Sequence, residues 1–177
     1  MGVFLSNKMT NIVANYKTFL VKILVLAIGK TDESWVQDGI DKYSKRLKHY
    51  ISFEFVIIPD LKNRKNLSES QQKEQEGKLI LKQVHNTDTL ILLDEKGKEF
   101  DSKSFSNFLQ QKMNTGIKRL VFVIGGPYGF STEVYNKATS KIALSKMTFS
   151  HQMIRPFFAE QVYRAFSILN NEPYHHQ

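Results

Sequence analysis

Residues 120–129 read Leu-Val-Phe-Val-Ile-Gly-Gly-Pro-Tyr-Gly, a continuous apolar run that passes directly into a glycine-rich turn. Such a run, bounded by glycine and proline, predicts a strand buried on both faces, which is typical of parallel sheets. Ligands of open α/β sheets bind beyond the carboxyl ends of the strands. The turn at 125–129 is therefore a candidate binding loop, although a tight turn that needs positive φ explains its glycines equally well.

Outward from this strand, short apolar runs alternate with amphipathic segments. The predicted strands are residues 22–28, 53–58, 89–93, 120–124 and 141–145. The predicted helices are residues 32–50, 69–84, 102–113 and 154–170, with a short helix that starts at Ser131 or Thr132. Asp32 and Ser102 are expected to cap the helices that they begin. This alternation predicts an α/β fold with a mostly parallel sheet and helices on both faces.

The composition is that of one ordinary folded domain of 177 residues. Because cysteine is absent, disulfides, thiolate zinc sites and cysteine nucleophiles are excluded, and no other metal-binding spacing is found. The formal charge of +8 favours an anionic partner such as RNA. Lys62, Arg64 and Lys65, in a predicted loop at 60–68, are candidate phosphate contacts, and a solvated lysine-rich loop is an equal alternative.

Residues 1–20 show neither a helical nor a strand period, and they precede the first strand of the predicted sheet. We expect them to be an N-terminal extension, either a misassigned start or a disordered arm, and residues 21–177 to form the domain. No apolar run approaches the roughly 20 residues that are needed to span a bilayer. The sequence therefore predicts a protein without a membrane partner.

Three further stretches are candidates for binding or chemistry. Residues 144–149 mix large apolar and short polar side chains and could hold a flat ring, although a strand end packed into the core is the commoner meaning. In the last predicted helix, Phe157 and Tyr163 widen the apolar face beyond one core contact, which favours a dimer interface. The tail at 172–177 carries histidine, the side chain best suited to proton exchange near neutrality.

The chain resembles one known family from residue 21 to its C-terminus at residue 177. The resemblance rests on VKILVLAIGK at 21–30, VFVIGGPYG at 121–129 and ALSKMTFSHQMIRPFFAEQVYRAFSILNNEPYH at 143–175, which are similar to the ribosomal RNA large subunit methyltransferase H family. This resemblance implies a SPOUT methyltransferase with a C-terminal trefoil knot. It further implies a cytoplasmic homodimer that uses S-adenosylmethionine to methylate N3 of a pseudouridine in helix 69 of 23S rRNA on assembled ribosomes.

The resemblance also implies a set of site residues. The implied cofactor contacts are Leu93, Gly125, Leu144, Ser145, Lys146, Met147, Thr148 and Phe149. For the chemistry we expect His175 to accept the N3 proton, Tyr174 to orient the base, and Arg164 to stabilise charge or hold a phosphate. A tail that only packs on the partner subunit is an equal alternative. The chain departs from the family pattern in its first twenty residues and in its His175-His176-Gln177 ending.

Two other functions remain open at this stage. A related knotted enzyme that acts on tRNA would share the cofactor site but not the substrate surface. A non-enzymatic ribosome-binding factor would use the basic surface alone and would not bind S-adenosylmethionine.

Overall fold

The structure is a computed structural model that describes residues 21–62 and 64–174. Its centre is a five-stranded sheet with the order β2-β1-β4-β3-β5, in which every pair of neighbouring strands is parallel. The strands are β1 (Lys22–Ile28), β2 (Ser52–Ile58), β3 (Thr89–Glu99), β4 (Arg119–Ile124) and β5 (Ser140–Ala143). The expected parallel α/β architecture is thereby confirmed. The expected extension at 1–20 lies outside the described residues, so the division at residue 21 stays a prediction.

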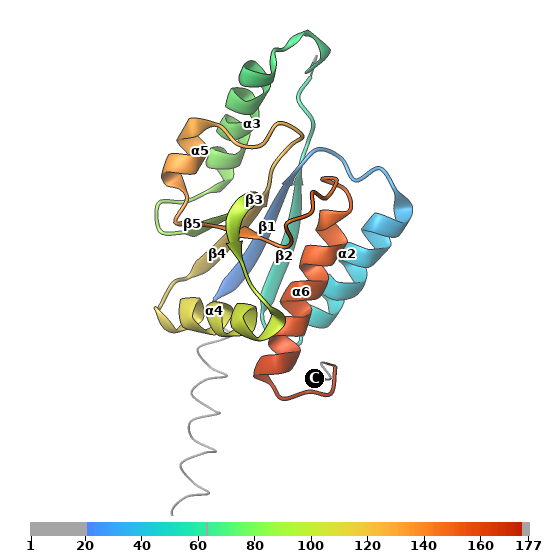
Figure 1. Cartoon of the computed structure of the whole chain (residues 1–177), viewed down its shortest axis with the longest axis vertical. Helices are drawn as coiled ribbons and strands as arrows, with labels where there is room; N and C mark the ends of the chain where they lie inside the picture. The colour runs from blue at the N-terminus through green and yellow to red at the C-terminus, as the bar shows by residue number, and fades with distance from the viewer. Residues whose placement is uncertain (1–20, 63, 175–177) are drawn as a thin grey trace, which may run out of the picture.

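Helices cover both faces of the sheet because successive strand residues point to opposite sides. Ile23 and Val25 join one core cluster with α2 (Ser34–Leu47), α4 (Ser102–Asn114) and α6 (Ile154–Leu169). Leu24 and Leu26 join a second cluster with α3 (Glu69–Gln83) and α5 (Thr132–Lys137). A short 3₁₀ helix, Arg64–Asn66, precedes α3. Figure 1 shows α6 between α2 and α4, and both of these helices contact it.

Two of the predicted helix caps are wrong. Helix α2 begins at Ser34, and its N-cap is Glu33 rather than Asp32. Helix α4 is capped by Asp101, whose carboxylate accepts a 2.6 Å hydrogen bond from the Ser104 N–H. A carboxylate one residue earlier is a charged acceptor at the positive end of the helix, and it takes the role expected of the Ser102 hydroxyl. Ser131 caps α5, one of the two starts that the sequence left open.

Strand β3 does not stop at Leu93 as predicted. It continues to Glu99 after an irregularity between Leu93 and Lys98, and Lys98 pairs with Ile142. Residues 94–97 therefore leave the sheet and return to it. Gly97 makes the return possible, because a Cβ at this position would lie 2.5 Å from the backbone nitrogen of Ile142. Strand β5 in turn ends at Ala143 and not at residue 145.

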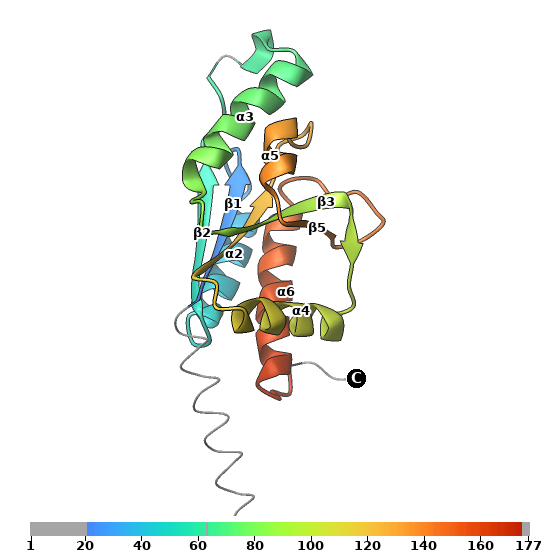
Figure 2. The ribbon, with the colours of Figure 1, turned by 90° about the vertical axis from the view of Figure 1, so that its left-hand side faces the viewer.

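Helix α6 runs beside the sheet from the carboxyl ends of the strands toward their amino ends. Figure 2 shows β1 pointing upward while α6 descends beside the sheet, so α6 starts near the carboxyl ends of the strands and finishes near their amino ends.

Of the two α6 residues expected to widen its apolar face, Phe157 is 45% exposed, whereas Tyr163 belongs to the core. Within the described residues, no helix is long and apolar enough to cross a membrane. The parallel sheet is compatible with the expected trefoil knot, which stays a prediction.

Candidate functional site

A pocket of about 560 Å³ lies at the carboxyl ends of β4 and β5, beside the middle of β3. Leu93, Ile124 and Ala143 line it; Ile124 and Ala143 are the last residues of β4 and β5, and Leu93 lies within β3, just before its irregularity. The volume falls within the range of about 300–1,000 Å³ that is typical of small-molecule sites. The pocket lies where ligands of parallel sheets bind, as the strand at 120–124 predicts.

The glycine loop at 125–129 forms one wall of this pocket. The Gly126 carbonyl accepts a 3.1 Å hydrogen bond from the Gly129 N–H, and Gly129 has a φ of +80°. A Cβ on Gly125 would lie 3.0 Å from ring carbons of Phe130. The loop is therefore a tight turn that needs glycine, and it also forms a wall of the pocket. The two explanations of its glycines are compatible.

Asp94, Glu95 and Lys96 form a second wall, whose two carboxylates the sequence did not predict as part of a site. The Asp94 carboxylate accepts a 2.6 Å hydrogen bond from the Tyr135 hydroxyl and a 2.8 Å bond from the Lys96 N–H. Burial, followed by the hydrogen bond and the charge of Asp94, raises the pKa of Tyr135 to about 12. The phenol therefore stays protonated at neutral pH and keeps donating to Asp94. Tertiary contacts such as the one with Tyr135 distinguish this stretch from a solvated turn.

The segment at 144–153 closes the third side. The Ser145 hydroxyl accepts a 2.9 Å hydrogen bond from the Met147 N–H, and the Phe149 ring lies 5.7 Å from that of Phe157. Met147 is 77% exposed, so an apolar side chain stands at the mouth of the pocket without a core contact that would explain it. Thr148 reaches across to Glu95 with a 3.5 Å hydrogen bond.

Most of the residues implied as cofactor contacts line this one pocket. They are Leu93, Gly125, Leu144, Ser145, Met147, Thr148 and Phe149. Lys146, although described by the structure, is not among the lining residues. The structure thus brings three separate stretches of sequence to one place, but whether they bind a cofactor stays a prediction.

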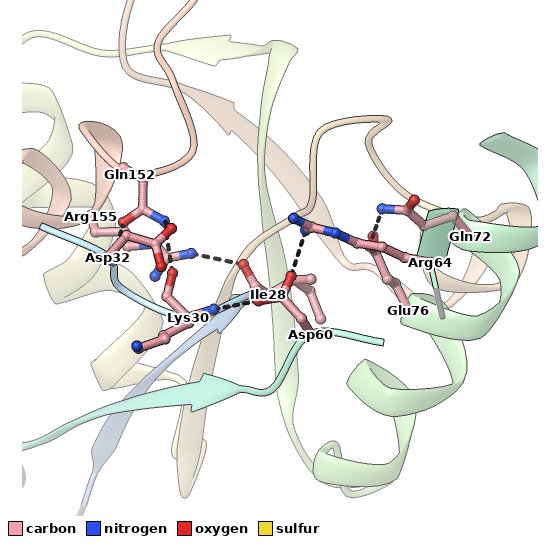
Figure 3. A network of polar contacts seen from close by, with 9 residues as sticks. All are labelled: Ile28, Lys30, Asp32, Asp60, Arg64, Gln72, Glu76, Gln152 and Arg155. Atoms are coloured by element: carbon pink, nitrogen blue, oxygen red, sulfur yellow. Dashed lines mark hydrogen bonds and ion pairs between the residues drawn. The ribbon is translucent and has the colours of Figure 1, made fainter. Parts of the chain in front are cut away.

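Arg155 attaches the third side of the pocket to the end of β1. This arginine is fully buried, and its guanidinium donates to the Ile28 carbonyl at 2.7 Å, to the Thr31 hydroxyl at 2.8 Å and to the His151 carbonyl at 2.9 Å. Figure 3 shows Gln152 beside it, with a 2.7 Å hydrogen bond to the Lys30 carbonyl. The sequence reasoning missed Arg155, because a charged side chain in a helix that also contains Glu160 and Arg164 gives no sign of burial.

Arg64, a candidate phosphate contact, lies near the same edge of the sheet. Its guanidinium pairs with Asp60 at 2.7 Å, and the second carboxylate oxygen of Asp60 accepts from the Lys30 N–H at 3.0 Å. Lys62 and Lys65 are exposed. The loop therefore presents free lysines beside an arginine that already has an acidic partner.

The two described residues of the expected catalytic set lie together, and neither of them lines the pocket. Arg164 pairs with Glu160 at 2.6 Å, the Tyr174 hydroxyl donates to Glu160 at 3.0 Å, and the guanidinium lies 4.9 Å from the centre of the Tyr174 ring. Burial, then hydrogen bonds with Tyr43 and Glu160, raise the pKa of Tyr174. For Arg164, burial acts to lower the pKa, and the hydrogen bond and charge of Glu160 outweigh it and raise the pKa.

The length of α6 separates this cluster from the pocket. Ile154 lines the pocket at the start of the helix, and Leu169 ends the helix near the tail. Arg164 comes ten residues after Ile154, which in an α-helix is a rise of roughly 15 Å. Neither Arg164 nor Tyr174 is among the residues that line the pocket of their own chain. The expected base, His175, lies outside the described residues.

Comparisons with known proteins agree on one family. Residues 21–175 match the family described as predicted SPOUT methyltransferases. The ribosomal RNA large subunit methyltransferase H of Christiangramia forsetii is 65% identical over 155 residues, which are 88% of this chain and 99% of that protein. The protein of the same name from Flavobacterium johnsoniae is 64% identical over 157 residues, which are 89% of this chain and all of that protein.

Among solved structures, a probable methyltransferase from Bordetella pertussis Tohama I is similar with a TM-score of 0.52. The match covers 87% of this chain and 98% of that one, at 8% sequence identity. At so low an identity the likeness concerns the fold alone.

Proposed function

This chain belongs to the ribosomal RNA large subunit methyltransferase H family of SPOUT methyltransferases, and from that premise we propose which nucleotide it modifies and how. The protein is a methyltransferase of large-subunit ribosomal RNA. Its proposed reaction is methyl transfer from S-adenosylmethionine to N3 of a pseudouridine in helix 69 of 23S rRNA. The proposed setting is the assembled ribosome in the cytoplasm. The observation that carries the proposal is the pocket that joins the glycine loop to residues 144–149.

The residues of the pocket fit S-adenosylmethionine. Leu93, Ile124 and Leu144 offer apolar surface to a flat purine, and the backbone of the glycine loop can approach a ligand closely. Asp94 and Glu95 place carboxylates in a wall where the sulfonium and ammonium charges of the cofactor need them. We propose the cofactor contacts implied by the resemblance, with Lys146 at the edge of the site.

The chemistry requires one proton to leave the substrate. Bound S-adenosylmethionine supplies an electrophilic methyl group on its sulfonium. The N3–H of pseudouridine must lose its proton around the time of attack, and a histidine titrating near neutrality suits that step. We therefore propose His175 as the base, Tyr174 as the group that orients the nucleobase, and Arg164 as the cation facing the developing charge.

The distance between the tail and the pocket supports a homodimer. Because α6 separates Arg164 and Tyr174 from the pocket of their own chain, the proposed catalytic set needs a second copy whose tail reaches this pocket. Phe157 and Met153 are exposed apolar side chains at the pocket end of α6, and they offer surface to such a copy. Each pocket would then be completed by the tail of the other chain.

Methyl transfer to defined RNA substrates tests the proposed function. Purified protein with labelled S-adenosylmethionine should methylate 70S ribosomes from a strain lacking this gene, and mass spectrometry should place the methyl group on a pseudouridine of helix 69. Transfer to tRNA instead would establish the rival knotted enzyme. Ribosome binding without any affinity for S-adenosylmethionine would establish the non-enzymatic factor.

A further inference from the structure

A buried carboxyl group lies directly behind the pocket. Glu76 on α3 is only 4% exposed, and Gln72, one helical turn earlier, donates a 2.7 Å hydrogen bond to its Oε1. Among the described residues, the other oxygen, Oε2, has no hydrogen-bond partner. An unpartnered buried oxygen costs about 1–3 kcal/mol, so an apolar side chain of similar size would serve stability better. Stability alone therefore does not explain a glutamate at this position.

The carboxyl group faces the glycine loop. A Cβ built on Gly126 would lie 2.4 Å from Oε2 of Glu76 and 2.9 Å from both its Cδ and its Oε1. Gly126 also lines the pocket. The backbone of Gly126 thus lies between the carboxyl group on one side and the ligand space on the other.

The contacts of α3 hold this carboxyl group in place. A Cβ on the next residue, Gly77, would lie 2.3 Å from the Ser131 hydroxyl oxygen and 3.3 Å from Val134, so α3 packs closely against the start of α5. Figure 3 shows Arg64 beside Glu76, with its hydrogen bond to Asp60. The backbone of α3 at Glu76 is therefore held close to α5, and the bond from Gln72 holds the carboxyl group.

We propose that Glu76 is a positioning residue of the cofactor pocket, which supports the Gly126 backbone from behind and fixes where Gly125 and Gly126 face the ligand. The proposal rests on the proposed function, in which this pocket binds S-adenosylmethionine. Glu76 supports the Gly126 backbone by filling the space beside it and not through its charge. A side chain of the same size in place of the glutamate therefore preserves it, and a shorter one does not.

Calorimetric affinity for S-adenosylmethionine tests this role. Glu76→Ala and Glu76→Asp should both bind the cofactor more weakly, the alanine variant by about tenfold, while Glu76→Gln should stay within about threefold of wild type. Glu74→Ala, an exposed position on the same helix, is the matched control and should bind as wild type does. The aspartate variant keeps the test valid if the alanine variant does not fold. Unchanged affinity in a folded Glu76→Ala or Glu76→Asp protein overturns the proposal.

A second substitution separates positioning from general damage. Gly126→Ala should weaken cofactor binding because its methyl group meets the whole carboxyl group of Glu76. Combining it with Glu76→Ala makes room for that methyl group, so the double variant should bind more tightly than Gly126→Ala alone by at least about threefold. If the losses of cofactor binding free energy in the two single variants simply add in the double variant, the proposed contact is contradicted. A wild-type protein with no affinity for S-adenosylmethionine would instead contradict the proposed function.

Discussion

Gly125 shows how one missing side chain can keep a pocket open. A Cβ at this position would meet the Phe130 ring at 3.0 Å, and the branched side chain of Gly125→Val must either displace the ring or enter the pocket. We expect this variant to fold but to lose measurable affinity for S-adenosylmethionine. Calorimetry gives the affinity and circular dichroism the fold. Wild-type affinity in the variant would remove the glycine loop from the proposed site.

The proposed base makes a prediction about rate and pH. His175→Ala should slow single-turnover methylation by about 10²–10⁴-fold, the usual loss for a positioned base, with the affinity for S-adenosylmethionine nearly unchanged. The wild-type rate should rise with pH through the titration of the histidine, and the variant should lack that inflection. A variant that keeps its rate and binds ribosomes weakly would make His175 a docking residue.

Burial of Glu76 makes a prediction about stability. Burial raises the pKa of this carboxyl group above its ordinary value of 4.5; the hydrogen bond from Gln72 and the charge of Arg64 oppose the rise, and Asp60 adds to it. Folding therefore favours the protonated form, and this contribution is complete below pH 4.5 and lost as pH rises through the folded pKa. The free energy of unfolding of wild type, relative to Glu76→Gln, should fall over that range in urea titrations. A difference in free energy of unfolding between the two proteins that does not change with pH would contradict this prediction.

The sequence predicted residues of the pocket where the residue type itself was informative. Gly125 follows a buried strand and was visible from local pattern, whereas Leu93 came from the family resemblance alone. Glu76 and Arg155 were not visible, because a charged residue in an amphipathic helix is normally on the solvated face. Only the packing of α3 and α6 against the glycine loop and β1 shows that these two charges are buried.

At the scale of an element, β3 is the instructive case. Its first half is an apolar run and was predicted, whereas Asp94-Glu95-Lys96-Gly97 is typical of a turn and gives no sign that the strand resumes. The resumption depends on Ile142, 44 residues later, with which Lys98 pairs. Such long-range pairing does not follow from local periodicity.

Gly97 tests whether the second half of β3 supports the pocket. Gly97→Ala places a methyl group 2.5 Å from the backbone of Ile142, which cannot move without disturbing β5. We expect a loss of about 1–3 kcal/mol in the free energy of unfolding, the usual cost of overpacking, together with weaker cofactor binding. Urea denaturation measures the first and calorimetry the second. Gly116→Ala is the control, because its own strain comes from a φ of +78° with no neighbour nearby. Equal effects of the two variants on cofactor affinity would show that β3 has no special role.

At the scale of the whole molecule, the layers were predictable and the strand order was not. Alternating strands and helices predict a parallel sheet covered on both faces, as observed. Strand β4 lies between β1 and β3, and that order depends on which crossovers pack best rather than on any single segment. The separation of Arg164 and Tyr174 from the pocket likewise becomes visible only once α6 is placed.

This separation predicts complementation between two inactive proteins. A Gly125→Val chain keeps its tail and a His175→Ala chain keeps its pocket, so a mixed dimer contains one site with both parts intact. Co-refolding the two should restore methylation to about a quarter of the wild-type rate, because half of the dimers are mixed and each has one complete site. Either variant refolded alone is the control. Activity no higher than the sum of the two would show that the tail serves its own chain or none.

The return of β3 to the sheet after residues 94–97 affects how long a ligand stays bound. A wall that is hydrogen-bonded to β5 on both sides of its excursion cannot swing outward as a flap does. The glycine loop is equally confined, between Phe130 and Glu76. The segment at 144–153 is the remaining side, and it contains neither helix nor strand. Residence time of the bound molecule should therefore follow the opening rate of this segment, and substitutions within it should change dissociation far more than association.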